Sequence, residues 1–183
     1  MDAEDTIMKL FKKLMAAALV GAMALTMLTG CGSTINKKEI VAVMEDRLSQ
    51  MYGIGITLTE ESTDKADKII SIIQKEYEAT DKDRKADFEP GYAVYKEDAK
   101  AAREALGIKE DAKGICIVSI AKVTKPTSQY DKKYNTMEML DKSYRVPLLD
   151  RLNSAPSNNG TVSMNTTKVG ETEYLVMVVS VDP

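Results

Sequence analysis

The chain has 183 residues, a formal net charge of −3, and neither histidine nor tryptophan. This slightly acidic balance, without a basic run, argues against nucleic acid as a partner, because neutralising phosphates requires clustered Lys and Arg. The absence of histidine excludes Ser-His-Asp and Cys-His catalytic units and histidine-rich zinc sites. Many hydrolase mechanisms are thereby excluded.

The N-terminal segment has the pattern of a secretory signal. From Met8 the chain reads Met-Lys-Leu-Phe-Lys-Lys, and residues 14–30 carry no charge. A basic region followed by a short apolar stretch is what the export machinery reads. Because three acids precede this basic region, we expect Met8 rather than Met1 to be the true start. An uncleaved N-terminal membrane helix is the alternative interpretation, although about 17 uncharged residues are at the lower limit for spanning a bilayer.

The end of the apolar stretch carries a specific resemblance. Leu28-Thr29-Gly30-Cys31 is similar to the lipobox of bacterial lipoproteins, in which lipid is transferred to the cysteine sulfur before the peptidase cuts in front of it. The resemblance covers only the leader, and it implies that Cys31 becomes the lipid-bearing N-terminus. Two or more acyl chains give stable membrane attachment, whereas one chain anchors only marginally.

The resemblance also implies domain boundaries and a location. We expect residues 1–30 to be a signal peptide, residues 31–35 to be the lipidated cysteine with a short tether, and residues 36–183 to form one domain. The tether would reach at most about 15 Å, so the domain would lie close to the headgroups. The expected location is the outer face of the cytoplasmic membrane, or a periplasm-facing membrane.

The first half of the mature chain alternates helices and short strands. Asn36 and Glu39 have the spacing of a helix N-cap and its third residue, and the helix they begin should end at Gly53. Residues 54–58 alternate as a short strand would, and an apolar stripe predicts a helix over residues 63–80. Residues 81–89 are expected to be a charged loop.

The middle of the chain holds the strongest strand. Residues 92–95 are expected to form a short strand, and residues 97–106 an Ala-rich helix that ends at Gly107. Residues 114–123 are rich in β-branched side chains, which predicts a strand in the interior of the sheet. A helix is then expected over residues 136–144, with an interruption at Pro147 and a short second helical piece reaching Leu152.

Residues 161–169 and 173–181 are predicted to form a hairpin about Gly170-Glu171. The second of these strands is apolar over residues 175–181, so it too should lie inside the sheet. The predicted fold class is α+β: an antiparallel β-sheet with two to four helices packed on one face.

Candidate catalytic motifs are weak. Cys116 lies between two isoleucines with no histidine to activate it, which favours an inert core position. Ser119 and Lys122 match the Ser-x-x-Lys motif of penicillin-binding proteins, but in a strand that spacing sends the two side chains to opposite faces. Ser62 and Lys65 also match, although Ser62 or Thr63 is better explained as a helix N-cap and the partner motifs are absent.

No metal or cofactor is expected. Asp81, Asp83, Asp87 and Glu89 suggest a calcium loop, but Lys85 and Ala86 break the EF-hand pattern, so we interpret the run as a solvated face. Pairs of carboxylates at the separation that glycoside hydrolysis needs would arise by chance in a chain with 28 acids.

The tyrosines are the best candidates for partner contact. Tyr92, Tyr95, Tyr130 and Tyr134 could offer apolar area and a hydroxyl to a cell-wall glycan or an envelope protein, although packing roles are the alternative. We therefore expect a non-enzymatic interaction module on the membrane surface. The alternative is a histidine-independent wall or envelope enzyme using carboxylate, Lys or Tyr groups.

Overall fold

The structure is a computed structural model, and it describes residues 35–124, 132–151 and 157–183. The predicted signal peptide, Cys31 and Tyr130 lie outside the described residues. Thr34–Pro183 forms a compact unit of its own. Its elements, in chain order, are α2 (Lys37–Tyr52), β1 (Thr57–Glu60), α3 (Asp64–Ala79), the 3₁₀ helix η1 (Lys82–Asp87), α4 (Pro90–Ala105), β2 (Gly114–Lys122), α5 (Lys132–Asp141), β3 (Tyr144–Arg151), β4 (Asn159–Val169) and β5 (Thr172–Val181).

The strands form one sheet in the order β1-β4-β5-β2-β3. The predicted hairpin is confirmed, with β4 and β5 antiparallel and Gly170 at a positive φ of 60° in the turn. β2 and β5 are interior strands, as their apolar runs predicted. The sheet is nevertheless mixed, because β1 pairs with β4 in parallel. An entirely antiparallel sheet was therefore the wrong prediction, since a partner strand about a hundred residues away leaves no local signal.

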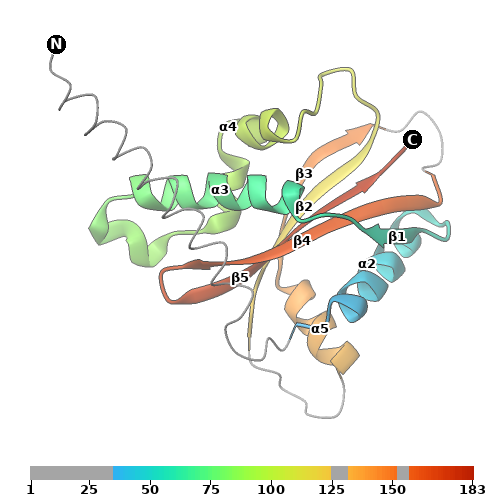
Figure 1. Ribbon diagram of the computed structural model, residues 1–183, viewed down its shortest axis with the longest axis horizontal. Helices are drawn as coiled ribbons and strands as arrows, with labels where there is room; N and C mark the ends of the chain where they lie inside the picture. Colours follow the sequence, from blue (N-terminus) through green and yellow to red (C-terminus); the bar gives the residue numbers. More distant parts are fainter. Residues whose placement is uncertain (1–34, 125–131, 152–156) are drawn as a thin grey trace, which may run out of the picture. The chain divides into compact units, whose positions relative to one another are not determined.

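The α+β class is confirmed, but helices cover both faces of the sheet (Figure 1). Along β5, Leu175, Met177 and Val179 pack in a core cluster with α2 and α5. Val176 and Val178 point the other way, into a cluster with α3 and α4. The prediction that the helices pack on one face only was therefore wrong. The unbroken apolar run of β5 requires this outcome, because alternate side chains of a strand face opposite sides and both sets must be buried.

The first two helices form where the sequence predicted them. Asn36 caps α2, with its side-chain oxygen accepting from the backbone N–H of Glu39 at 3.4 Å, and Gly53 ends the helix at a φ of 70°. In α3 the side chains of Ala66, Ile69 and Ile73 are fully buried. The charged segment after α3 is the short 3₁₀ helix η1 and not an open loop.

Residues 92–95 belong to α4 and not to a strand. Pro90 occupies the first turn of α4, a position that suits its fixed φ and missing N–H. Residues Lys96–Ala99 then leave helical geometry, so α4 is two helical pieces joined by a sharp turn. The predicted helix over residues 97–106 is confirmed in its second half, where Gly107 follows at a φ of 69°.

The segment around Pro147 is also corrected. β3 runs antiparallel to β2 at the edge of the sheet, with a register shift opposite Cys116 and Ile117. Pro147 is compatible with an edge strand because such a strand has ladder bonds on one side only. Val146 and Leu148 are buried on either side of Pro147, as alternate residues of a strand would be. The prediction of a helix interrupted at Pro147 was therefore wrong. The preceding helix, α5, spans Lys132–Asp141 and so begins one turn earlier than predicted.

Candidate functional site

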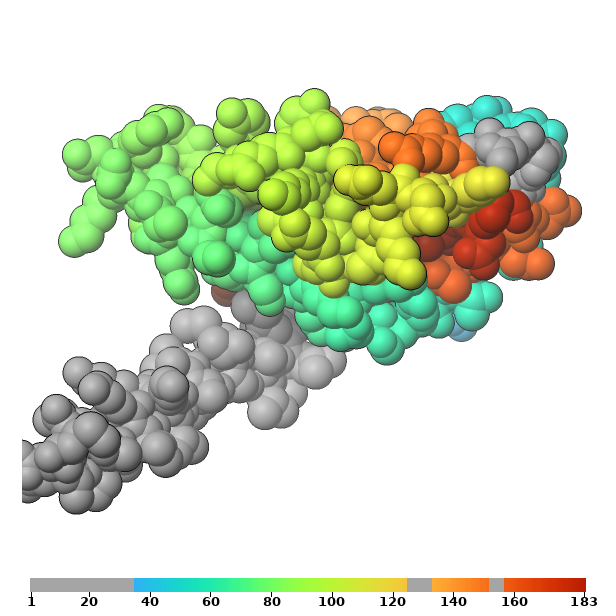
Figure 2. Space-filling model, turned by 90° about the horizontal axis from the view of Figure 1, so that it is seen from above, coloured from blue at the N-terminus to red at the C-terminus, as the bar shows by residue number. Residues whose placement is uncertain are grey.

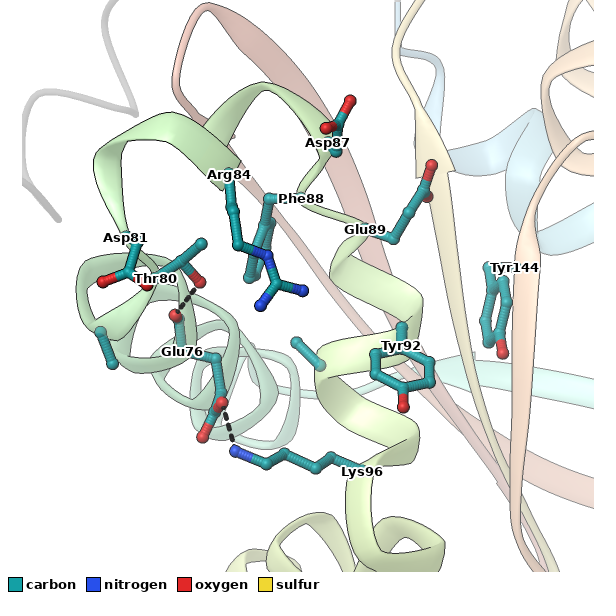
Figure 3. Close-up of a pocket in the computed structure, with 12 residues that line it drawn as sticks. Glu76, Thr80, Asp81, Arg84, Asp87, Phe88, Glu89, Tyr92, Lys96 and Tyr144 are labelled. Atoms are coloured by element: carbon teal, nitrogen blue, oxygen red, sulfur yellow. Dashed lines mark hydrogen bonds and ion pairs between the residues drawn. The ribbon is translucent and has the colours of Figure 1, made fainter.

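A hollow of about 700 Å³ lies between the end of α3, η1, the start of α4 and the first residue of β3. Figure 2 looks onto α4 and shows η1 and the beginning of α4 as a lobe at one end of the described domain. The close-up in Figure 3 shows the side chains around the hollow. Those that line it are Glu76, Ala79, Thr80, Asp81, Arg84, Asp87, Phe88, Glu89, Tyr92, Ala93, Lys96 and Tyr144.

Aromatic contacts hold η1 against α3. The rings of Tyr77 and Phe88 meet edge to face, with centroids 5.2 Å apart. The ammonium of Lys85 lies 4.5 Å from the centroid of the Tyr77 ring, within the range of a cation–π attraction. These contacts join the end of α3 to the far end of η1, so they fix the wall of the hollow from which Arg84 projects.

The opposite wall is formed by α4 and the start of β3. The ring of Tyr144 packs against the α-carbon of Gly91, where any Cβ would collide with it. Tyr92 follows on α4 and is 67% exposed. Tyr144 is 45% exposed, so both rings present area to solvent at the hollow. Exposed tyrosine rings, each carrying a hydroxyl, are suited to contact a ligand that is part apolar and part polar.

The charges around the hollow are unevenly paired. Lys96 Nζ forms an ion pair with Glu76 Oε2 at 2.9 Å, which raises the pKa of Lys96. The carboxylates of Asp81, Asp87 and Glu89 do not converge; Figure 3 shows them directed outward on different sides. The guanidinium of Arg84 is directed into the hollow. Among the described residues, no carboxylate forms an ion pair with it.

A strained turn leads away from the hollow. Glu97, Asp98 and Ala99 have φ values of 51°, 58° and 59°, in the left-handed region that costs a non-glycine residue about 1–2 kcal/mol. The Asp98 carboxylate lies 3.5 Å from the guanidinium of Arg103 in the helical piece that follows. Residues held in such conformations cluster at functional sites, and here the turn begins at Lys96, which lines the hollow.

The four tyrosines predicted for partner contact do not form one patch. Tyr92 lines the hollow, whereas Tyr95 is exposed on the same helix but does not line it. Tyr134 is exposed on α5, across the sheet from α4. Tyr130 lies outside the described residues. Sequence reasoning missed Arg84 as a site residue, because nothing in a charged run marks which side chain will remain without a carboxylate partner.

The other candidate motifs occupy ordinary structural positions. Cys116 is 6% exposed, its sulfur accepts a hydrogen bond from Ser180 at 3.8 Å, and burial raises the pKa of the thiol. Ser119 is buried and donates to the hydroxyl of Ser143 at 3.0 Å, while Lys122 is exposed. Lys65 pairs with Glu61 at 2.7 Å. In the described part of the chain no three acidic or cysteine side chains are grouped as metal ligands.

Comparison with protein-family models, with curated proteins and with solved structures gave no match to this chain. Among the helices of the described residues, none is both long enough and apolar enough to cross a bilayer.

Proposed function

We propose that this chain is a bacterial lipoprotein, anchored by lipid on Cys31 at the outer face of a membrane. The supporting observation is the position of the Leu28-Thr29-Gly30-Cys31 motif relative to the fold. The compact unit begins at Thr34, three residues after Cys31, and its first helix is capped by Asn36. Removal of the segment before Cys31 would therefore leave the unit whole.

The proposed activity of the anchored domain is binding, with the hollow as the ligand site and a cell-wall component as the ligand. The contact groups are the exposed rings of Tyr92 and Tyr144 and the guanidinium of Arg84, which pairs with no carboxylate in the described part of the chain. General acid and base catalysis by two carboxylates needs both to reach one reacting centre. The divergent directions of Asp87 and Glu89 favour binding over such chemistry.

The anchor is tested by metabolic labelling with a radioactive fatty acid in the source bacterium. The two cysteines of the chain, Cys31 and Cys116, provide a matched pair of variants. Cys31→Ser should abolish labelling and release the protein from the membrane fraction. Cys116→Ser should remain labelled and membrane-bound. Undiminished labelling of Cys31→Ser would refute the lipoprotein proposal.

The binding site is tested by co-sedimentation of the full-length protein, in detergent, with isolated cell-wall sacculi. Ala79 and Ala86 are both exposed, but only Ala79 lines the hollow. Ala79→Trp should fill the hollow and abolish co-sedimentation, whereas Ala86→Trp should sediment like the wild type. Equal sedimentation of the two variants would contradict a site in the hollow. Release of soluble wall fragments by the wild type would instead support the alternative, a histidine-independent wall enzyme.

A further inference from the structure

The chemistry of the ligand is indicated first by Arg84. Its guanidinium enters the hollow from η1, and no described carboxylate pairs with it although four line the same space. The neighbouring cation, Lys96, is already held by Glu76 at 2.9 Å. A guanidinium presents a planar fork of donors that matches a carboxylate in two parallel hydrogen bonds. Arg84 is therefore the group available to receive an anionic part of a ligand.

The surrounding charges limit what else the ligand can carry. Once Lys96 and Glu76 neutralise one another, Asp81, Asp87 and Glu89 remain around the single charge of Arg84. These three carboxylates would repel further negative charges on a ligand, so binding of a polyanion would be disfavoured. A ligand with one carboxylate and at least one ammonium group would satisfy both Arg84 and the outer acids.

The remaining lining is suited to a short aliphatic frame between those two charges. Ala79, Ala93 and Phe88 contribute apolar surface, and Tyr92 adds an exposed ring. Apolar lining with a few placed polar groups is the usual construction of a small-molecule site. A space of about 700 Å³ is large enough for a dipeptide-sized group.

We propose that the hollow binds a zwitterionic peptide, with its terminal carboxylate on the Arg84 guanidinium and its ammonium groups at the rim of the hollow, where the outward-directed carboxylates of Asp81, Asp87 and Glu89 make the electrostatic potential negative. This inference rests on the proposed function, since it specifies the part of a wall component that the hollow receives. The group that Arg84 recognises is a free carboxylate.

Isothermal titration calorimetry with the full-length protein in detergent tests the inference. Three probes separate the charges: lysyl-alanine, lysyl-alanine amide, and lysyl-alanine acetylated on both amines. The wild type should bind lysyl-alanine at least about tenfold more tightly than either derivative, because the amide lacks the carboxylate that Arg84 receives and the acetylated peptide lacks both ammonium groups. Equal binding of the acid and the amide, or no binding of lysyl-alanine, would overturn the inference.

Variants of residues on η1 test whether the carboxylate of the peptide binds Arg84. Arg84→Met should weaken lysyl-alanine binding about tenfold but leave the affinity for the amide unchanged. Arg84→Lys keeps the charge but loses the fork, so it should retain only part of the affinity. Lys82→Met is the matched control, because Lys82 is exposed on the same helix and does not line the hollow. Equal effects of Arg84→Met on acid and amide would refute the pairing.

The two proposals fail in distinguishable ways. If lysyl-alanine does not bind, yet Ala79→Trp still abolishes co-sedimentation with sacculi, the zwitterion inference is wrong and the wall-binding proposal stands. If the sacculus experiment shows no difference between Ala79→Trp and Ala86→Trp, the hollow is not the wall site. Labelling of Cys31 is independent of both results. Thermal unfolding of Arg84→Met, expected to match the wild type because Arg84 is exposed, verifies that the variant is folded.

Discussion

The ring of Tyr144, at the start of the edge strand β3, lies directly on the α-carbon of Gly91 in the first turn of α4. The two residues are separated by more than fifty positions in the sequence, and their contact closes one wall of the hollow. The atoms that crowd Gly91 are Cβ, Cγ and Cδ1 of the tyrosine. Because Cβ and Cγ are near the backbone, the ring cannot yield by a rotation of its far end alone.

Gly91→Ala should destabilise the protein by about 1–3 kcal/mol, since inserting a methyl group into a packed contact forces the neighbours to shift. At an unobstructed helical position the same change would stabilise by up to about 1 kcal/mol, so the sign is diagnostic. Urea denaturation measures the difference. In a Tyr144→Ala background, Gly91→Ala should lower the free energy of unfolding much less than it does in the wild type. Gly55→Ala is the control, because nothing lies within 4 Å of a Cβ at Gly55.

The local signals that predicted the fold were those carried by neighbouring residues. Asn36 and Gly53 marked the two ends of α2, and the apolar runs of β2 and β5 marked the interior strands. The predictions failed for residues that are compatible with both a helix and a strand. Tyr92 and Tyr95 favour strands, but Pro90 at a helix start determined the outcome.

The candidate site was predictable only in part, for a physical reason. Tyr92 could be recognised as an aromatic residue near a turn, but its neighbours in the hollow come from four separate elements. Whether Arg84 would pair with Asp81, Asp87 or no acid at all depends on side-chain directions in η1 that composition does not encode. The parallel pairing of β1 with β4 is likewise a long-range contact without a local signal.

Ser163 on β4 supplies a bond that the start of α3 lacks locally. Its hydroxyl oxygen accepts from the backbone N–H of Ala66 at 3.1 Å, and the serine is fully buried. Thr63, at the N-cap position, makes no side-chain capping bond. Ser163→Ala should therefore cost about 1–3 kcal/mol in urea denaturation, because a buried N–H is left unsatisfied. The exposed Ser62→Ala should cost less than about 1 kcal/mol; a larger effect there would show that the local cap dominates.

Cys116 should be unreactive in the folded protein. Burial raises the pKa of its thiol, and the thiolate is the reactive form. In a Cys31→Ser background, modification by a disulfide reagent at about pH 8 should be on the order of 100-fold slower in the folded than in the urea-unfolded protein. Comparable rates would mean that β2 opens readily.

The same pKa shift gives a pH dependence of stability. Because the folded-state pKa of Cys116 lies above the unfolded value of about 8.5, its contribution is fully present below that pH. It is lost as the pH rises toward the folded-state value. The free energy of unfolding should therefore fall more steeply with rising pH above about pH 8.5 in the wild type than in Cys116→Ala. Parallel slopes for the two proteins would contradict this assignment.

The turn within α4 predicts a stabilising substitution. Glu97 has a φ of 51° and is exposed, and truncating its side chain would remove a minor electrostatic attraction to Lys96, which already pairs with Glu76. Glycine adopts a positive φ without the steric cost of a Cβ, although it loses more entropy on folding. Glu97→Gly should therefore raise the free energy of unfolding by about 0.5–1 kcal/mol. Ala101→Gly, at an exposed position in the following helical piece, should lower it by about 1 kcal/mol. If both substitutions destabilise the protein equally, α4 is one continuous helix in solution, and the wall of the hollow at Lys96 is formed differently.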